Sequence, residues 1–249
     1  DTASELGYSV VIDTVSERRP EKEARDKTMG QTVRRTIGRK GGTRMAERRR
    51  LPEETRREEI LTACDQLYDV RGFREITIKD ISTKTSFSRP SLYNYFQTKE
   101  EIFLALLTRE YALWTADLQK IAQTGESLPK QALAEKIAAS LEKRRTMLKI
   151  MAMNLYETEE NSRPEFLVAF KRQFAASLDA FASLLRRADP PMTAEKADAV
   201  RYAFFPFMNG VYAYVYPTEK QCSAMDEAGL SFRRMTIAEI TGNFLKQIL

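Results

Sequence analysis

Histidine is absent from this chain of 249 residues. Its absence removes the side chain that most often serves as a general base or metal ligand, and with it every Ser-His or Cys-His nucleophile arrangement. Glycine is also sparse, and its one adjacent pair, Gly41-Gly42, lies in a basic segment with no strand before it, unlike a phosphate-binding loop. The sequence therefore gives no support to an enzyme, and we expect neither a cofactor nor a metal site.

Cysteine and long apolar runs are scarce as well. The two cysteines, Cys64 and Cys222, lie far apart inside helical patterns, where a small buried thiol is the ordinary interpretation, so we expect no disulfide. No run of about 18 apolar residues is present, and the N-terminus lacks the apolar core of a signal peptide. We therefore predict a cytoplasmic protein without a membrane segment.

Charge is abundant, and its excess lies at one end of the chain. Residues 1–50 hold 13 Lys and Arg against 8 Asp and Glu, an excess of five that equals the net charge of the whole chain. The remaining residues are therefore neutral overall. Such a body can bind DNA if its cations gather on one face.

Residues 1–45 are predicted to form a basic, flexible leader, because they are polar and show no sustained helical period. The basic run continues through Arg48, Arg49 and Arg50. Two interpretations stay open: an arm that lies along DNA phosphates or enters the minor groove, or a solvated leader without such a role. The chain opens with Asp1, and Met45 is the natural beginning by position, so whether the leader belongs to the native protein is left open.

Two threonines mark helix starts further along the chain. Thr77 is followed three residues later by Asp80, and Thr98 by Glu101, and both pairs are capping boxes or close variants of them. In a capping box the hydroxyl accepts a backbone N–H of the first turn, while the acidic side chain accepts the N–H of the capping residue. We therefore predict that a helix begins one residue after each threonine.

Further signals bound the neighbouring helices. Ser88 precedes Arg89-Pro90, which places a hydroxyl cap before a proline in a first helical turn. An earlier helix is predicted from Glu53, and Gly72 is expected to end it in the left-handed conformation.

The two short helices that begin near Thr77 and Ser88 share one core. Their apolar residues fall at Ile78, Ile81, Phe87, Leu92 and Phe96. This pattern, joined by the turn Thr85-Ser86-Phe87, predicts a helix-turn-helix. In such a unit the second helix presents its outer face to the major groove of DNA. That face carries Arg89, Ser91, Tyr93, Asn94 and Tyr95.

The side chains on this face suit DNA. Hydroxyls, amides and cations bind phosphates, while Arg and Asn can form paired hydrogen bonds with guanine and adenine edges. We assign Arg89 and Asn94 to base edges, and Tyr93, Tyr95 and Lys99 to phosphates. The alternative is a surface helix of a bundle with an accidental polar face. The full set of predicted DNA contacts is Thr77, Lys79, Ser88, Arg89, Pro90, Ser91, Tyr93, Asn94, Tyr95 and Lys99.

At these residues the chain resembles the TetR family of bacterial transcriptional regulators. The resemblance covers roughly residues 54 to 107 and rests on Gly72-Phe73, Thr77-Ile78, Asp80-Ile81, Leu92-Tyr93, Tyr95-Phe96 and Lys99-Glu100-Glu101 before Ile102. In the turn, Thr85-Ser86-Phe87 departs from the family's usual Ala-Gly-Val. The resemblance implies a ligand-responsive repressor that binds a palindromic operator on double-stranded DNA as a homodimer. A helical protein–protein adaptor that has kept the fold without DNA binding is the alternative.

The whole chain is predicted to be all-α, because no stretch alternates in hydropathy with β-branched enrichment. We expect an N-terminal helix-turn-helix three-helix domain over residues 46–98. Residues 99–249 are expected to form a C-terminal helical bundle for ligand binding and dimerisation. Its helices are predicted at Lys99 to about Gln123, Ser127 to about Arg145, Leu148 to Glu157, from Arg163-Pro164 onward, Thr193 to Tyr216 and Met235 to Leu249.

Aromatic residues crowd the predicted helix from Thr193 to Tyr216, which Pro206 and Asn209-Gly210 are expected to kink. A kinked aromatic helix can line a cavity, although core or dimer packing is the more common role of such residues. The residues predicted to bind a small-molecule effector are Trp114, Phe170, Phe174, Tyr202, Phe205 and Tyr212. Those predicted at the dimer interface are Ile237, Ile240, Phe244 and Ile248, a stripe that could instead be buried within one subunit.

Overall fold

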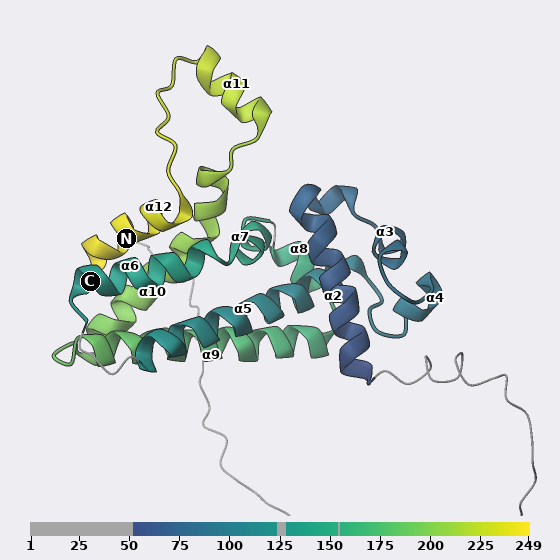
Figure 1. The fold of residues 1–249 in the computed structure, drawn as a ribbon, viewed down its shortest axis with the longest axis horizontal. Helices are drawn as coiled ribbons and strands as arrows, with labels where there is room; N and C mark the ends of the chain where they lie inside the picture. Colours follow the sequence, from purple (N-terminus) through teal and green to yellow (C-terminus); the bar gives the residue numbers. More distant parts are fainter. Residues whose placement is uncertain (1–51, 124–127, 154) are drawn as a thin grey trace, which may run out of the picture. The chain divides into compact units, whose positions relative to one another are not determined.

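The computed structural model describes residues 52–123, 128–153 and 155–249 (Figure 1). This part of the chain is built from helices and contains no strand, which confirms the all-α prediction. Its elements are α2 (Glu53–Val70), η1 (Phe73–Glu75), α3 (Ile78–Thr83), α4 (Arg89–Leu92), α5 (Lys99–Gln123), α6 (Lys130–Glu142), α7 (Arg145–Met151), α8 (Leu155–Glu160), α9 (Pro164–Ala188), α10 (Ala194–Val215), α11 (Glu219–Glu227) and α12 (Ile237–Ile248). The predicted leader, residues 1–45, lies outside the described residues.

The described helices belong to one compact unit, so the predicted division into residues 46–98 and 99–249 stays a prediction. None of them is both long enough and apolar enough to cross a lipid bilayer.

The short helices α3 and α4 form the predicted helix-turn-helix, and α2 supports it as the first of the three predicted helices. The residues that α2 buries are Ile60, Leu61, Ala63, Cys64, Leu67 and Tyr68. The capping box that starts α3 is present as predicted. The Thr77 hydroxyl accepts the Asp80 N–H at 3.2 Å, and the Asp80 carboxylate accepts the Thr77 N–H at 2.9 Å. α4 begins at Arg89 and α5 at Lys99, also as predicted.

Gly72 does not end α2 in the left-handed conformation, so this prediction was wrong. Its φ of −80° and ψ of 159° are extended, as is the backbone of Arg71, which follows the last residue of α2. Gly72 instead starts η1, and its backbone N–H donates to Glu75 Oε2 at 2.6 Å. Gly72 therefore serves as the residue before η1 and not as the end of α2.

The centre of the protein is formed by α5 and α9, which lie side by side in Figure 1. Their facing sides are aromatic: the Tyr111 and Phe174 ring centroids are 5.6 Å apart, and those of Trp114 and Phe181 are 6.5 Å apart. α10 adds Phe204, which is fully buried, to the same core. The helices α2, α6, α7 and α8 pack on α5, α10 packs on α9, and α12 lies on α6.

Some helix boundaries differ from the prediction. The helix expected to reach Arg145 ends at Glu142, and the one expected from Leu148 to Glu157 is divided into α7 and α8. α10, by contrast, agrees closely with the predicted Thr193 to Tyr216 and contains Pro206, and its kink stays a prediction.

The sequence predicted no helix between Tyr216 and Met235, but α11 forms there. Both cysteines are free, but only Cys64 is buried as expected, since Cys222 of α11 is partly exposed.

Candidate DNA-binding site

One side of α4 is held in the core and the other is open. α4 has four residues, after which the chain turns. Leu92 and Phe96 are 0% and 1% exposed, so the inner side of this segment is fixed. Arg89, Tyr93 and Asn94 are exposed. The structure thus brings three of the predicted DNA contacts together on one segment.

Arg89 and Tyr93 are paired across one helical turn. Arg89 Nη2 donates to the Tyr93 hydroxyl at 2.9 Å, and the Arg89 guanidinium carbon lies 5.7 Å from the centroid of the Tyr93 ring. Because a guanidinium carries five N–H groups, this bond leaves donors for a base or a phosphate. The pair holds the guanidinium at the surface of the recognition segment.

The start of α4 presents hydroxyls. Ser88 stands at the capping position, but its side chain makes no bond to the backbone, so the predicted hydroxyl cap is not formed. Its Oγ lies 3.1 Å from Ser91 Oγ instead. Pro90 lies in the first turn, as predicted. Lys79 is exposed on the preceding helix, α3.

Two residues predicted to bind phosphate have partners within the protein. The Tyr95 hydroxyl accepts Arg56 Nη1 at 3.0 Å, and its ring centroid lies 6.2 Å from that of Phe87. Lys99 Nζ donates to the Phe73 carbonyl at 2.8 Å and lies 4.0 Å from the centroid of the Phe73 ring. These contacts join α2 to the end of the recognition segment and η1 to the start of α5, and the role of both residues in phosphate binding stays a prediction.

Glu59 of α2 holds the turn between α3 and α4. Its carboxylate accepts the backbone N–H of Ser86 and, at 3.0 Å, the Ser86 hydroxyl. The sequence did not predict this contact. Helical spacing carries no signal for it, because the partner lies 27 residues further along the chain.

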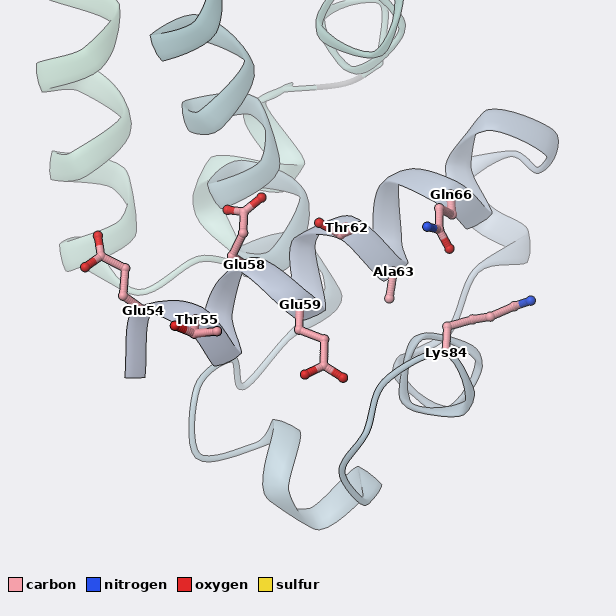
Figure 2. A pocket seen from close by; sticks show the side chains of 8 residues that line it. All are labelled: Glu54, Thr55, Glu58, Glu59, Thr62, Ala63, Gln66 and Lys84. Atoms are coloured by element: carbon pink, nitrogen blue, oxygen red, sulfur yellow. The ribbon is translucent and has the colours of Figure 1, made fainter. Parts of the chain in front are cut away.

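A hollow of about 640 Å³ lies beside α2, next to Glu59 (Figure 2). Its lining residues are Glu54, Thr55, Glu58, Glu59, Thr62, Ala63, Gln66 and Lys84. Three carboxylates and one amine make this lining net negative, which repels a phosphate backbone. The hollow is therefore unsuited to DNA, in contrast to the exposed side of α4.

An ion pair between the buried Glu101 and the partly exposed Arg163 ties the recognition segment to α9. The fully buried carboxylate of Glu101 accepts Arg163 Nε at 2.6 Å and Arg163 Nη2 at 3.0 Å. It also accepts the backbone N–H of Gln97 at 2.6 Å, while Arg163 Nη2 donates to the Tyr95 carbonyl at 3.2 Å. The end of the recognition segment is therefore fixed to the residue that precedes α9.

These hydrogen bonds decide the charge of Glu101. Burial by itself raises the pKa of a carboxyl group, but the bonds from the Arg163 side chain and the Gln97 backbone outweigh it. They hold the pKa of Glu101 below its usual value, so the group is ionised at neutral pH.

Aromatic packing strengthens the same junction. The rings of Phe96 and Phe166 lie 5.3 Å apart, and the Arg57 guanidinium carbon lies 5.8 and 5.7 Å from their two centroids. In addition, the Thr98 hydroxyl donates to the Asn161 carbonyl at 2.9 Å. Packing and hydrogen bonds thus connect the helix-turn-helix to the start of α9.

A second junction joins α7 to α2. The Tyr68 hydroxyl donates to the Lys149 carbonyl at 3.1 Å, and Lys149 Nζ donates to the carbonyls of Tyr68 and, at 3.1 Å, Arg71. The Asp65 carboxylate accepts the Thr146 hydroxyl at 2.8 Å. The C-terminal part of α2 is therefore held by α7.

Four of the six predicted effector contacts lie together in the protein interior. The ring centroids of Trp114 and Phe205 are 5.8 Å apart, those of Phe174 and Phe205 are 5.5 Å apart, and Phe170 adjoins Phe174 at 6.1 Å. Tyr202 is 72% exposed and does not join this group. The sixth, Tyr212, packs on Tyr216 instead, with centroids 4.9 Å apart. Tyr202 and Tyr212 therefore do not adjoin the other four rings, and their part in effector binding stays a prediction.

The predicted dimer residues on α12 face their own subunit in large part. Ile237 is fully buried, so it has no surface to offer a partner, and its assignment to the interface was wrong. The Phe244 ring stacks on Phe207 of α10, with centroids 4.1 Å apart. Ile240, Phe244 and Ile248 are partly buried and pack on the core.

Known proteins share this arrangement. The family model for the tetracyclin repressor-like, C-terminal domain matches residues 108–249, more than half of the chain. The model for bacterial regulatory proteins, tetR family, matches residues 60–106. The chain belongs to the TetR family. It thus has the domains of a DNA-binding transcription regulator, in agreement with the resemblance seen in its sequence.

Named relatives of this TetR-family chain are regulators. The HTH-type transcriptional activator FasR of Mycolicibacterium smegmatis (strain ATCC 700084 / mc(2)155) is 35% identical over 69 residues, 28% of this chain and 31% of that protein. The HTH-type transcriptional repressor NemR of Escherichia coli (strain K12) is 32% identical over 74 residues, 30% of this chain and 37% of that protein. The matches span about a third of each relative.

The fold also agrees with a solved structure. The TetR family transcriptional regulator PfmR from Thermus thermophilus superposes with a TM-score of 0.51 and 18% sequence identity. The superposition covers 76% of this chain and 96% of that one. At this identity the likeness concerns the fold alone.

Proposed function

We propose that this TetR-family protein binds a palindromic operator as a homodimer and acts as a ligand-responsive repressor. The observation that supports operator recognition most is the exposed side of the α4 segment, where Arg89, Tyr93 and Asn94 lie opposite the buried Leu92 and Phe96. Such a side chain set, held on a rigid support, is what sequence-specific binding in a major groove requires.

The residues divide into two roles. Arg89 and Asn94 contact base edges, with Ser91 and Lys79 nearby, because Arg and Asn form paired hydrogen bonds with guanine and adenine. Tyr93 and Ser88 bind phosphates and set the register of the protein on the duplex.

Four further residues support these contacts or add to them. Thr77 and Pro90 fix the starts of α3 and α4. To bind a phosphate, Tyr95 must give up its hydrogen bond from Arg56, and Lys99 must give up its hydrogen bond to the Phe73 carbonyl.

The dimer interface is placed on the exposed side of α10. Small residues recur there at alternating spacings of four and three, at Ala199, Ala203, Pro206, Gly210 and Ala213. This is the spacing of a seam between two helices, and small side chains allow close approach. Tyr202 and Tyr214, 72% and 66% exposed, flank the seam. Two copies related by a twofold axis bury this surface and present two recognition segments to the operator.

The effector is proposed to act through α9. Its aromatic group, with Trp114, Phe174 and Phe205, lies between α5, α9 and α10. A ligand that displaces α9 from α5 changes the bonds of Arg163 to Glu101 and to the Tyr95 carbonyl, and hence the position of the recognition segment. This shift requires that the ligand bind one of the two arrangements more tightly.

Selection of bound sites from random duplex DNA by the purified chain tests this proposal. We expect an enriched sequence with two inverted half-sites whose centres lie roughly 34 to 36 Å apart, or a multiple of that. Enrichment of a single half-site would contradict the proposal that the protein binds DNA as a dimer. Recovery of no preferred sequence, with binding insensitive to salt, would favour an adaptor that has kept the fold.

A further inference from the structure

The segment between α10 and α12 has no core of its own. α11 contains no buried residue, and no residue from Tyr216 to Thr236 is buried. In Figure 1, α11 and its two connections stand apart from the other helices. We call residues 217–236 the arm.

The arm is nevertheless well specified locally. Thr218 and Gln221 form a capping box, with the Gln221 N–H donating to the Thr218 hydroxyl at 3.3 Å and the Thr218 N–H to Gln221 Oε1 at 2.9 Å. At the other end Gly229 has a φ of 66°, which glycine adopts without strain, and the Leu230 N–H donates to the Met225 carbonyl at 2.9 Å. The sequence therefore encodes both ends of α11.

The capping box and the glycine end do not by themselves keep a helix as short as α11 folded. A helix of nine residues is marginal in water, because nucleation is unfavourable and most helical stability comes from packing an apolar face. Cys222 and Met225 are three residues apart and therefore share one side of α11. Leu230, just after the helix, is 56% exposed. These apolar side chains need a surface that the described part of the chain does not supply.

We propose that the arm packs against a second copy of the chain, beside the exposed side of the partner's α10. The arm leaves α10 directly after Tyr214 and Tyr216, so it begins at the edge of the seam proposed for the dimer. A twofold axis makes each arm meet the same surface on the other copy. At 1.5 Å per residue α11 is about 13 Å long, which is enough to cross the width of one neighbouring helix.

This inference rests on the proposed dimer, and the exposed aromatic residues of α10 support it. Tyr202 and Tyr214 offer an apolar surface with a polar tip, a combination common where proteins meet. Each arm would cover such residues on the other copy, while its own Met225 and Leu230 leave solvent. The arm therefore contributes to dimer affinity and not to the fold of one subunit.

Point substitutions test the arm in the full chain. Met225→Glu and Leu230→Glu are expected to raise the dimer dissociation constant, measured by sedimentation, at least about tenfold. They should leave helicity and the unfolding midpoint of the monomer unchanged, since neither residue is buried. The matched control is Ala224→Glu, which adds the same charge to an exposed position away from the side of Cys222 and Met225. A dissociation constant that is unchanged in both variants would overturn the proposal.

Limited trypsin digestion gives a second measurement on the unmodified protein. The arm offers cleavage sites at Lys220, Arg233 and Arg234. Cleavage there is expected to slow as protein concentration rises through the dimer dissociation constant, because the partner covers the arm. If the dimer is cut at the same rate as the monomer, the proposed packing of the arm on the partner is overturned, but the dimer is not. A protein that stays monomeric at micromolar concentration overturns the proposed dimer as well.

Discussion

At the scale of single residues, specific recognition is assigned to few side chains. Arg89→Ala should weaken binding to the selected operator by about 1 to 3 kcal/mol and relax the base preference at one position, while random duplex is bound almost as before. Fluorescence anisotropy with both duplexes at one salt concentration measures the two affinities. Lys120→Ala, which removes an exposed cation of α5, is the control and should change neither. An equal loss on both duplexes would make Arg89 a phosphate contact only.

The ion pair of the buried Glu101 with Arg163 predicts a pH-dependent stability. Glu101→Gln should lower the free energy of unfolding at pH 7 by about 2 to 3 kcal/mol, since it weakens charged hydrogen bonds. Glu165 also pairs with Arg163, at 3.1 Å, but is largely exposed. Glu165→Gln is therefore the control, with an expected change below about 1 kcal/mol.

The sign of the pH effect follows from the lowered pKa of Glu101. A carboxyl whose pKa is lower in the folded state stabilises fully above its unfolded pKa, near 4.3, and this contribution is lost as the pH falls through the folded pKa. Urea unfolding of the wild type and Glu101→Gln should therefore differ at pH 7 and converge in acid. A difference that stays constant down to pH 3 would contradict the role given to this carboxylate.

At the scale of helices, the sequence predicted where a helix begins better than it predicted how the helices pack together. The capping signals at Thr77 and Thr98 predicted the starts of α3 and α5, because these signals are local. At Thr98 only half of the box forms: its hydroxyl accepts the Glu101 N–H at 3.1 Å, but the Glu101 carboxylate accepts the N–H of Gln97. The same signal at Thr218 and Gln221 was overlooked, since α11 lacks the apolar face that marks a helix in the core. The contact of Glu59 with Ser86 could not be predicted, because it depends on how distant segments meet.

The candidate site shows the same difference between local features, which the sequence predicted, and contacts between distant segments, which it did not. The exposed residues of the α4 segment were predictable, because Leu92 and Phe96 fix which side is buried. The partners of Tyr95 and Lys99 were not, since both lie more than 25 residues away in sequence. Phe244 illustrates the limit for the dimer: its stripe is apolar, but its ring stacks on Phe207 within the subunit. A charge at Phe244 would disturb this packing and would not test the interface cleanly.

The cap of α3 carries a prediction for stability. Thr77→Ala should lower the free energy of unfolding by about 1 kcal/mol, because the Asp80 N–H loses its acceptor. Thr83→Ala serves as the control in the same helix: its exposed hydroxyl bonds only to the Asp80 carbonyl, and the expected change is within about 0.5 kcal/mol. Chemical denaturation measures both. Equal losses would show that the capping box does not stabilise the domain.

At the scale of the whole molecule, the dimer can be tested at a position that leaves the fold intact. A side chain added at Gly210 of α10 meets nothing within 4 Å in the subunit. Gly210→Glu should therefore fold normally and sediment as a monomer, because it places a charge in the proposed seam. Gln119→Glu, at an exposed position of α5, adds the same charge and should remain dimeric. A dimeric Gly210→Glu protein would move the interface away from this side of α10.

The central claim is that two recognition segments read one palindrome, and the salt dependence of binding tests it most directly. The affinity of the purified chain should be measured between about 50 and 200 mM salt for the selected palindrome, a single half-site and a scrambled duplex. We predict that all three affinities fall steeply with salt, and that the palindrome is bound at least about a thousandfold more tightly than the scrambled duplex. Equal affinity for palindrome and scrambled duplex, or binding that does not change with salt, would contradict the account.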